Sequence, residues 1–264
     1  MPRDGEQLVA IPLDDPSDGP GELAASLVVP EDAKGIAILV HGGLSSRCCP
    51  RDGAVASGLR RSGFATVLLD LLTEPEAEED LASGRYGLDL DLLAGRVVAA
   101  TRWVATSPGI CALPLGHFGA STGAAAVLAA AVAAPDCFDA VVSCGGRVDL
   151  LDPERLARVE APVLLVDGTA EAGPRAREKD ERVLAMARAA QERLPCARLA
   201  ILRGATHWLG EPGTADLVAR LAAEWFEAHL LGPDTSVPLR TATAAEDAPT
   251  GPPGSRVRFS SLGL

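Results

Sequence analysis

The sequence is poor in aromatic residues, which make up 3% of its 264 positions. A core must therefore be built mainly from leucine, valine and alanine, and the 47% hydrophobic content is enough for one large domain. Basic residues are also scarce, since 24 Lys and Arg stand against 36 Asp and Glu and leave a formal net charge of −12. Nucleic acid and anionic membranes repel such a chain, so we expect neither as a partner.

No apolar run has the roughly 20 residues of a membrane-spanning helix. The N-terminal segment lacks the basic-then-apolar order of a signal peptide, and we expect a cytoplasmic location. The six cysteines form no Cys-x-x-Cys pair and have no histidine at metal-ligand spacing, which favours free thiols and predicts no metal and no other cofactor. Cys48 and Cys49 follow a loop expected near the functional site, where an oxidation-sensitive thiol is the alternative to an ordinary one.

Short apolar runs alternate with helical patterns along residues 1–231, whereas residues 232–264 are rich in Pro, Thr, Ser and Gly and are predicted to be a disordered tail. The alternation predicts the α/β class, with a mostly parallel sheet, helices on both faces and ligands at the carboxyl ends of the strands. The acidic run within residues 71–87 is interpreted as a solvated loop. The predicted strands are residues 7–12, 22–29, 35–40, 64–69, 115–118, 138–144, 162–167 and 197–202, and the predicted helices are 51–62, 88–105, 122–134, 180–194 and 213–231.

The chain is organised around residues 115–135, where an apolar run passes through Gly119-Ala-Ser121-Thr122-Gly123 into an alanine-rich helix. A Gly-x-Ser-x-Gly turn between a strand and a helix is the pattern of a nucleophile elbow, because its glycines let the backbone reverse without Cβ clashes. Such a pattern also arises by chance, but the flanking strand and helix favour the catalytic interpretation. Ser121 is thus the candidate nucleophile, and the amide of Thr122 is a candidate oxyanion donor.

A second oxyanion donor is expected after the strand at 35–40, which ends in His41-Gly42-Gly43. Hydrolases with a nucleophile elbow take a backbone amide from this connection. Gly43 is the candidate donor, with Leu44 next, and an ordinary glycine turn is the alternative. His41 is expected to orient the loop.

A serine hydroxyl needs an adjacent base to accept its proton during attack. His207 follows the last predicted strand, where this architecture delivers its base, whereas His117 and His229 lie inside predicted elements and are expected to be structural.

The third member of a triad should be a carboxylate after the strand between nucleophile and base. Glu171 lies in the loop after residues 162–167, and Asp167 at the end of that strand is the alternative. The order Ser121, Glu171, His207 matches the Ser, Asp/Glu, His order of α/β-hydrolases.

With these residues in place, the chain resembles an α/β-hydrolase without a large lid domain, because only about fifteen residues separate the strands at 138–144 and 162–167. It is most similar to the dienelactone-hydrolase-like group, some members of which occur fused to phosphoribosyltransferases. The resemblance covers roughly residues 35–230. It rests on residues 41–47 (HGGLSSR), 118–126 (FGASTGAAA), 145–147 (GGR), 204–207 (GATH) and 211–214 (EPGT).

The chain departs from this group at two places. The usual Gly-x-x-Asp appears as Gly168-Thr-Ala-Glu171, and Ser121 stands where dienelactone hydrolases proper have cysteine. Arg47 and Arg147 follow strand-end loops, where they could hold a carboxylate or phosphate of a substrate or pin those loops.

The resemblance and the triad together imply a serine hydrolase of the carboxylic ester hydrolase type. It would cleave an ester, lactone or thioester of a small acyl substrate through an acyl-enzyme. A non-catalytic ligand-binding protein on the same fold and an acyltransferase with the same triad are the alternatives. The sequence leaves homo-oligomerisation open.

Overall fold

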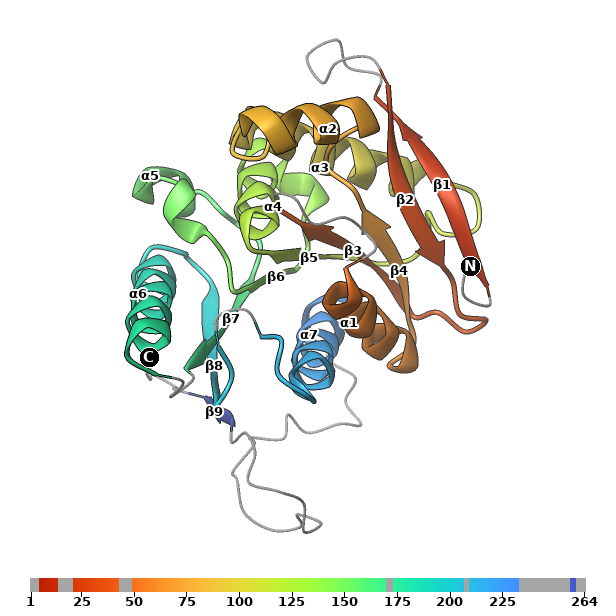
Figure 1. Cartoon of the computed structure of the whole chain (residues 1–264). Coiled ribbons are helices and arrows are strands. Elements are labelled where there is room, and N and C mark those ends of the chain that lie inside the picture. Colours follow the sequence, from red (N-terminus) through yellow and green to blue (C-terminus); the bar gives the residue numbers. More distant parts are fainter. Residues whose placement is uncertain are drawn as a thin grey trace.

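The protein folds around a nine-stranded sheet in the order β1-β2-β4-β3-β5-β6-β7-β8-β9 (Figure 1). The computed structural model describes residues 5–13, 21–42, 49–169, 173–206, 209–232 and 257–259. The strands are β1 (Glu6–Pro12), β2 (Glu22–Val28), β3 (Gly35–His41), β4 (Phe64–Leu69), β5 (Leu115–Ala120), β6 (Val141–Cys144), β7 (Val163–Thr169), β8 (Ala197–Arg203) and β9 (Val257–Phe259).

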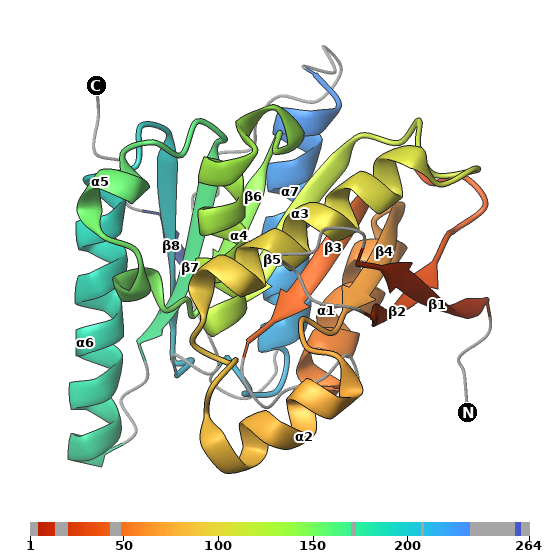
Figure 2. The same ribbon diagram turned by 90° about the horizontal axis from the view of Figure 1, so that it is seen from above.

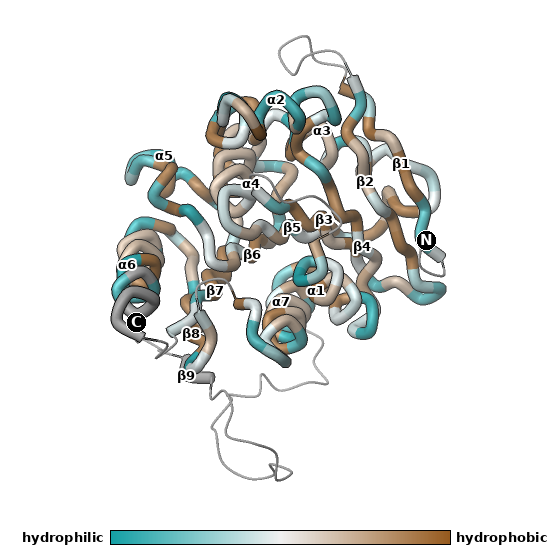
Figure 3. The backbone as a smooth tube through the Cα atoms, viewed as in Figure 1, coloured by the Kyte–Doolittle hydropathy of each residue, from teal (hydrophilic) through white to brown (hydrophobic). Residues whose placement is uncertain are grey.

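Six neighbouring strands, from β4 through β8 in the sheet order, pair in parallel, while β1, β2 and β9 add antiparallel pairs at the two edges. Every residue of β3, β4, β5 and β6 is buried, as expected for strands covered on both faces. Figure 3 shows β3 and β4 as largely hydrophobic tubes. The predicted α/β class with a mostly parallel sheet is confirmed.

Helices pack on both faces of the sheet (Figure 2). One face carries α3, α4 and α6 in the larger apolar cluster, and the other carries α1 and α7 with Phe64 and Phe226 in the smaller one. Within the described ranges, none of the helices combines the length and hydropathy of a membrane span. The helices are α1 (Pro50–Arg61), α2 (Glu74–Ser83), α3 (Leu90–Thr106), α4 (Thr122–Ala133), α5 (Pro153–Leu156), α6 (Gly173–Gln191) and α7 (Thr214–Leu230), with 3₁₀ turns at Pro135–Cys137 and Val148–Leu150.

The prediction of a solvated loop at 71–87 is wrong, because this segment contains α2. Thr73 precedes the helix, and the carboxylate of Glu76 accepts hydrogen bonds from the Thr73 amide at 2.8 Å and its hydroxyl at 2.7 Å. This is a capping box, which supplies hydrogen-bond partners for backbone amides at the start of a helix. The fully buried Arg96 of α3 anchors the turn by donating to Glu76 Oε1 at 2.5 Å and to the Leu71 carbonyl at 2.7 Å.

The structure differs from the expectation of a disordered tail at Val257–Phe259, which form β9 against β8. β-branched and aromatic residues favour an extended strand, and β8 offers an unpaired edge. The remainder of the predicted tail lies outside the described residues, and the boundary at residue 231 stays a prediction. The five cysteines in the described ranges are free thiols.

Candidate active site

The turn between β5 and α4 holds Ser121 in a strained conformation. Its φ of 54° and ψ of −126° place a residue with a side chain in a region that suits glycine. Three backbone hydrogen bonds keep it there, because the Ser121 amide donates to Cys144 O at 3.2 Å and its carbonyl accepts from the amides of Ala124 and Arg147. Strain of this kind costs about 1–3 kcal/mol and persists only where the surroundings enforce it.

Glycines bring the end of β3 against the start of α4. A Cβ atom added to Gly123 would lie 2.6 Å from the Val40 carbonyl oxygen, and one added to Gly42 would lie 2.3 Å from Thr122 Cβ and 2.4 Å from the amide nitrogen of Gly123. Real Cβ atoms essentially never approach so closely. The segment that precedes Gly43 is therefore in direct backbone contact with the segment that follows Ser121.

The first turn of α4 provides a backbone amide beside the nucleophile candidate. Ser121 is the N-cap residue of α4, but its hydroxyl makes no capping hydrogen bond. Thr122 is the first residue of α4, and the amides of a first helical turn have no partner within the helix, where the helix dipole favours negative charge. Gly43, the other candidate donor, lies outside the described residues.

The candidate base and acid, His207 and Glu171, also lie outside the described residues, so both stay predictions. The strands before them, β8 and β7, run parallel to β5 and end at the same edge of the sheet. Beside position 207, the Thr206 amide donates to Glu211 Oε1 at 2.9 Å, and the Leu209 amide donates to the Thr206 carbonyl at 2.9 Å.

Asp167, the alternative acid, lies within β7 with 3% of its surface exposed. Burial, together with the nearby Asp180, raises the pKa of this carboxyl well above its ordinary value. Burial therefore opposes the ionised form of Asp167, and the ionised form is the one that stabilises an imidazolium.

Arg147 is paired within its own loop. Its guanidinium donates from Nε to Asp149 Oδ1 at 2.7 Å and from a terminal nitrogen to Oδ2 at 2.8 Å. The pKa of Asp149 is lowered by these bonds. This pairing favours the loop-pinning alternative, and a substrate contact by Arg147 stays a prediction. Arg47 lies outside the described residues.

His41 ends β3, in register with Ala120 of β5, and belongs to a polar cluster with Arg51 and Asp52 of α1. Arg51 Nη2 lies 2.6 Å from His41 Nε2, and a guanidinium can only donate, so Nε2 accepts. The proton therefore sits on Nδ1, which donates to the Gly42 carbonyl at 2.8 Å. Burial lowers the pKa of His41, and Arg51 lowers it further against the opposing effect of Asp52.

Sequence reasoning missed this cluster, although a signal was present. His41 closes a strand, and Cys49 and Asp52 stand three residues apart where a helix begins at Pro50, a spacing that places two side chains on one helix face.

His117, by contrast, lies in the core as predicted. It is fully buried, stacks on Phe138 and has a pKa lowered to about 3 by burial.

A cavity of about 630 Å³ opens beside this cluster. It lies between β1, β2 and α2, and the carboxyl ends of β3 and β4 contribute to its wall. The lining residues include His41, Asp70, Leu71, Leu23 and Leu81.

Comparison with known proteins places the chain in a family, although no family model matches it. A dienelactone hydrolase from Anabaena variabilis is 42% identical with a TM-score of 0.76, and the match covers 85% of this chain and 98% of that one. The esterase Est1E from Butyrivibrio proteoclasticus shares the fold, with 17% identity, a TM-score of 0.62 and coverage of 83% and 97%.

Two Mycobacterium tuberculosis proteins named as phosphoribosyl transferases are 44% identical over 219 residues, which are 83% of this chain. The match covers 46% of their length, so the chain spans about half of these relatives. The strained serine turn, the parallel sheet and the near-complete match to the cyanobacterial structure agree on one assignment. The chain belongs to the dienelactone-hydrolase-like group of α/β-hydrolases.

Proposed function

We propose that the protein is a serine hydrolase that cleaves an ester, lactone or thioester of a small acyl substrate. The observation that carries the proposal is the backbone of Ser121, whose positive φ holds a side chain at the tip of the β5–α4 turn. A serine that only capped α4 would accept a bond from the helix start and would need no strain, but the Ser121 side chain makes no such bond.

In the proposed reaction, Ser121 Oγ attacks the substrate carbonyl while His207 accepts its proton and Glu171 stabilises the resulting imidazolium. The amides of Thr122 and Gly43 donate to the oxyanion, and each such donor is typically worth about 3–4 kcal/mol of barrier. His207 then protonates the departing alcohol or thiol, and water releases the acyl group by the same steps in reverse order. The raised pKa of Asp167 supports Glu171 as the acid.

The names of the related structures and the size of the cavity beside His41 support this substrate class. The related structures are named as a dienelactone hydrolase and as esterases, one of them described with ferulic acid bound. The cavity of about 630 Å³ is within the range of about 300–1,000 Å³ that suits small ligands. Dienelactone hydrolases proper have a cysteine where this chain has Ser121, so we propose other esters, lactones or thioesters ahead of a dienelactone as the substrate.

The mycobacterial relatives are named as transferases, but this name does not apply to the region that they share with this chain. The matched region carries the hydrolase fold, and more than half of each relative lies outside the match. We therefore assign any phosphoribosyl transfer to the part of those proteins that this chain does not cover.

Labelling of the purified protein with a fluorophosphonate tests the proposal. Peptide mapping should find one modified serine, Ser121, and both Ser121→Ala and His207→Gln should prevent labelling while the protein remains folded. Turnover of p-nitrophenyl esters, lactones and thioesters would then identify the acyl class.

An unlabelled wild-type protein with an intact thermal transition would refute the hydrolase proposal and favour the non-catalytic alternative. Labelling together with acyl transfer to an added alcohol or amine in preference to water would favour the acyltransferase.

A further inference from the structure

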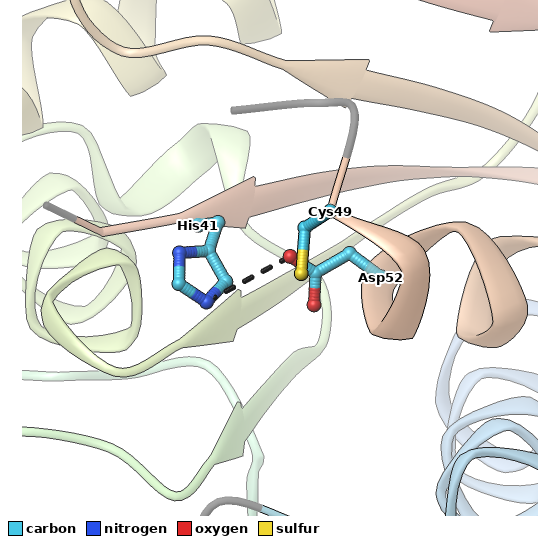
Figure 4. A group of neighbouring side chains, drawn as sticks. All are labelled: His41, Cys49 and Asp52. Atoms are coloured by element: carbon cyan, nitrogen blue, oxygen red, sulfur yellow. Dashed lines mark ion pairs between the residues drawn. The ribbon is translucent and has the colours of Figure 1, made fainter. Parts of the chain in front are cut away.

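One group of side chains outside the proposed triad has the composition of a metal site. In the parts of the chain that the structure describes, His41, Cys49 and Asp52 are the set of His, Cys, Asp or Glu residues whose ligand atoms converge, all lying within 4.8 Å of one another (Figure 4). Their nitrogen, sulfur and oxygen atoms are the three kinds of ligand that Zn²⁺ accepts. We propose that these three residues bind a divalent transition-metal ion of the zinc class.

The distance between the nitrogen and oxygen ligands fits this ion with little movement. Tetrahedral zinc holds nitrogen and oxygen ligands at about 2.0–2.1 Å, which requires those two atoms to be roughly 3.3 Å apart. His41 Nε2 and Asp52 Oδ2 are 3.7 Å apart. A contraction of a few tenths of an ångström therefore suffices for this pair, and Cys49 supplies the third ligand from the residue that precedes α1.

The tautomer of His41 and the buried oxygen of Asp52 also suit metal binding. The bond from His41 Nδ1 to the Gly42 carbonyl leaves the lone pair on Nε2, and this is the arrangement that orients metal-binding histidines. Asp52 has 5% of its surface exposed, and its Oδ2 atom has no hydrogen-bond partner. A buried carboxylate oxygen without a partner is costly, and a cation would satisfy it.

Arg51 is the competitor for this position. Its guanidinium donates to His41 Nε2 at 2.6 Å and lies 3.2 Å from Asp52 Oδ1 through Nε. A metal ion must displace the guanidinium from Nε2, so the site exchanges one cationic partner for another. With ionised Cys49 and Asp52 the ligands carry two negative charges, which match a divalent ion, and binding releases the thiol proton.

The position of the site connects it to the turn that carries Ser121. His41 pairs in register with Ala120, the residue before Ser121, and His41 and Cys49 flank residues 42–48 on both sides. An ion bound by both residues would tie together the two ends of the segment that contains Gly43. Zinc occupancy should therefore change the rate of the proposed hydrolase, but the metal site itself does not depend on that activity.

Metal binding is measured directly, with Zn²⁺ in competition with a chromophoric chelator and with Co²⁺ as a spectroscopic probe. We expect one ion per chain and a thiolate-to-cobalt charge-transfer band. Cys49→Ser should remove the band, and Cys49→Ser and Asp52→Asn should each weaken zinc binding by more than about 100-fold, because changes outside the ligand set alone cost about 10- to 100-fold. Serine is a good N-cap residue, so Cys49→Ser should fold.

Two further variants sharpen the test. Arg51→Gln removes the competing cation and should tighten zinc binding, whereas Cys111→Ser and Cys196→Ser change exposed thiols and should leave it unchanged. Binding that survives Cys49→Ser, or that is lost in Cys48→Ser instead, would overturn the assignment. Absence of stoichiometric zinc binding to the folded wild-type protein would overturn the proposal altogether, whatever the fluorophosphonate experiment shows.

Discussion

Replacement of Gly42 by alanine should disturb the site through the contact between the end of β3 and the start of α4. The new Cβ would lie 2.3 Å from Thr122 Cβ, 2.6 Å from Thr122 Cα and 2.4 Å from the amide nitrogen of Gly123. Ordinary carbon contacts begin at about 3.5 Å, so the two segments must separate by roughly 1 Å. Backbone forms much of the obstacle, and a change of side-chain rotamer cannot relieve it.

The expected cost has two parts. Overpacking of this kind destabilises proteins by about 1–3 kcal/mol, which for a domain of this size lowers the melting temperature by roughly 2–12 °C. A displacement of about 1 Å between reacting groups costs about 100-fold in rate, or about 2.7 kcal/mol of barrier. The fluorophosphonate labelling rate of Gly42→Ala should therefore fall by about two orders of magnitude.

Thermal unfolding followed by circular dichroism and the labelling rate of the folded protein measure these two parts separately. Gly210→Ala is the matched control, because a Cβ at that position meets no heavy atom within 4 Å and Gly210 has no positive φ. Wild-type stability and labelling in Gly42→Ala would refute the argument that this glycine holds the two segments together.

Three further outcomes are expected. Ser121→Gly should melt about 2–4 °C above Ser121→Ala, because glycine relieves about 1 kcal/mol of strain at a φ of 54°, and equal melting temperatures would contradict that strain. Burial and Asp180 raise the pKa of Asp167, so wild-type stability should fall as pH rises above about 4 through the folded-state pKa. Asp167→Asn should remove this fall in urea titrations across pH and should keep turnover, whereas a loss of turnover would identify Asp167 as the acid. Burial opposes ionisation of Glu76, but the hydrogen bonds from Arg96 and Thr73 prevail and lower its pKa. Glu76→Gln should therefore cost about 1–2 kcal/mol at neutral pH, and the difference from wild type should vanish as pH falls below that lowered pKa.

The parallel core was predictable because its strands are buried on both faces. Residues such as Gly35–His41 and Phe64–Leu69 read as short apolar runs, and each became a strand within a residue of the expected bounds. The order of the strands was not predicted, since nothing in an apolar run states which neighbour it pairs with. β2 pairs with β4 and not with β3, although β3 follows it in the chain.

The acidic residues led to the wrong prediction of a loop at residues 71–87, because hydrogen bonds at the start of α2 favour a helix there. The run Glu74–Asp80 is acidic enough to suggest a solvated loop, but Thr73 and Glu76 satisfy each other at a helix start, and the buried Arg96 offsets part of the negative charge. Arg96 on α3 also donates to the Glu76 carboxylate, and a local sequence pattern cannot reveal a partner that is twenty residues away in the chain.

In the candidate site, too, features formed by contiguous residues were predictable, and contacts between separate segments were not. The strained turn at Ser121 was predictable because the strand, turn and helix that form it are contiguous in the sequence, and the role of Ser121 as nucleophile stays a prediction. The cluster of His41, Arg51 and Asp52 was not, because it needs the end of β3 to meet the start of α1 across residues 42–48.

The place of β5 in the middle of the sheet has a consequence for how the protein folds. β3 and β5 are adjacent, yet residues 42–114 separate them in the chain and form β4 at one side and α1, α2 and α3 around it. Closing so long a connection is entropically slow, and non-local parallel pairing is a late event in folding. The edge hairpin of β1 and β2 has no such delay, because its strands are close in the chain. Partly folded chains that retain this hairpin or single helices would still lack the β3–β5 contact beside Ser121. During refolding, the proposed reaction of Ser121 with a fluorophosphonate should therefore recover only in the last phase.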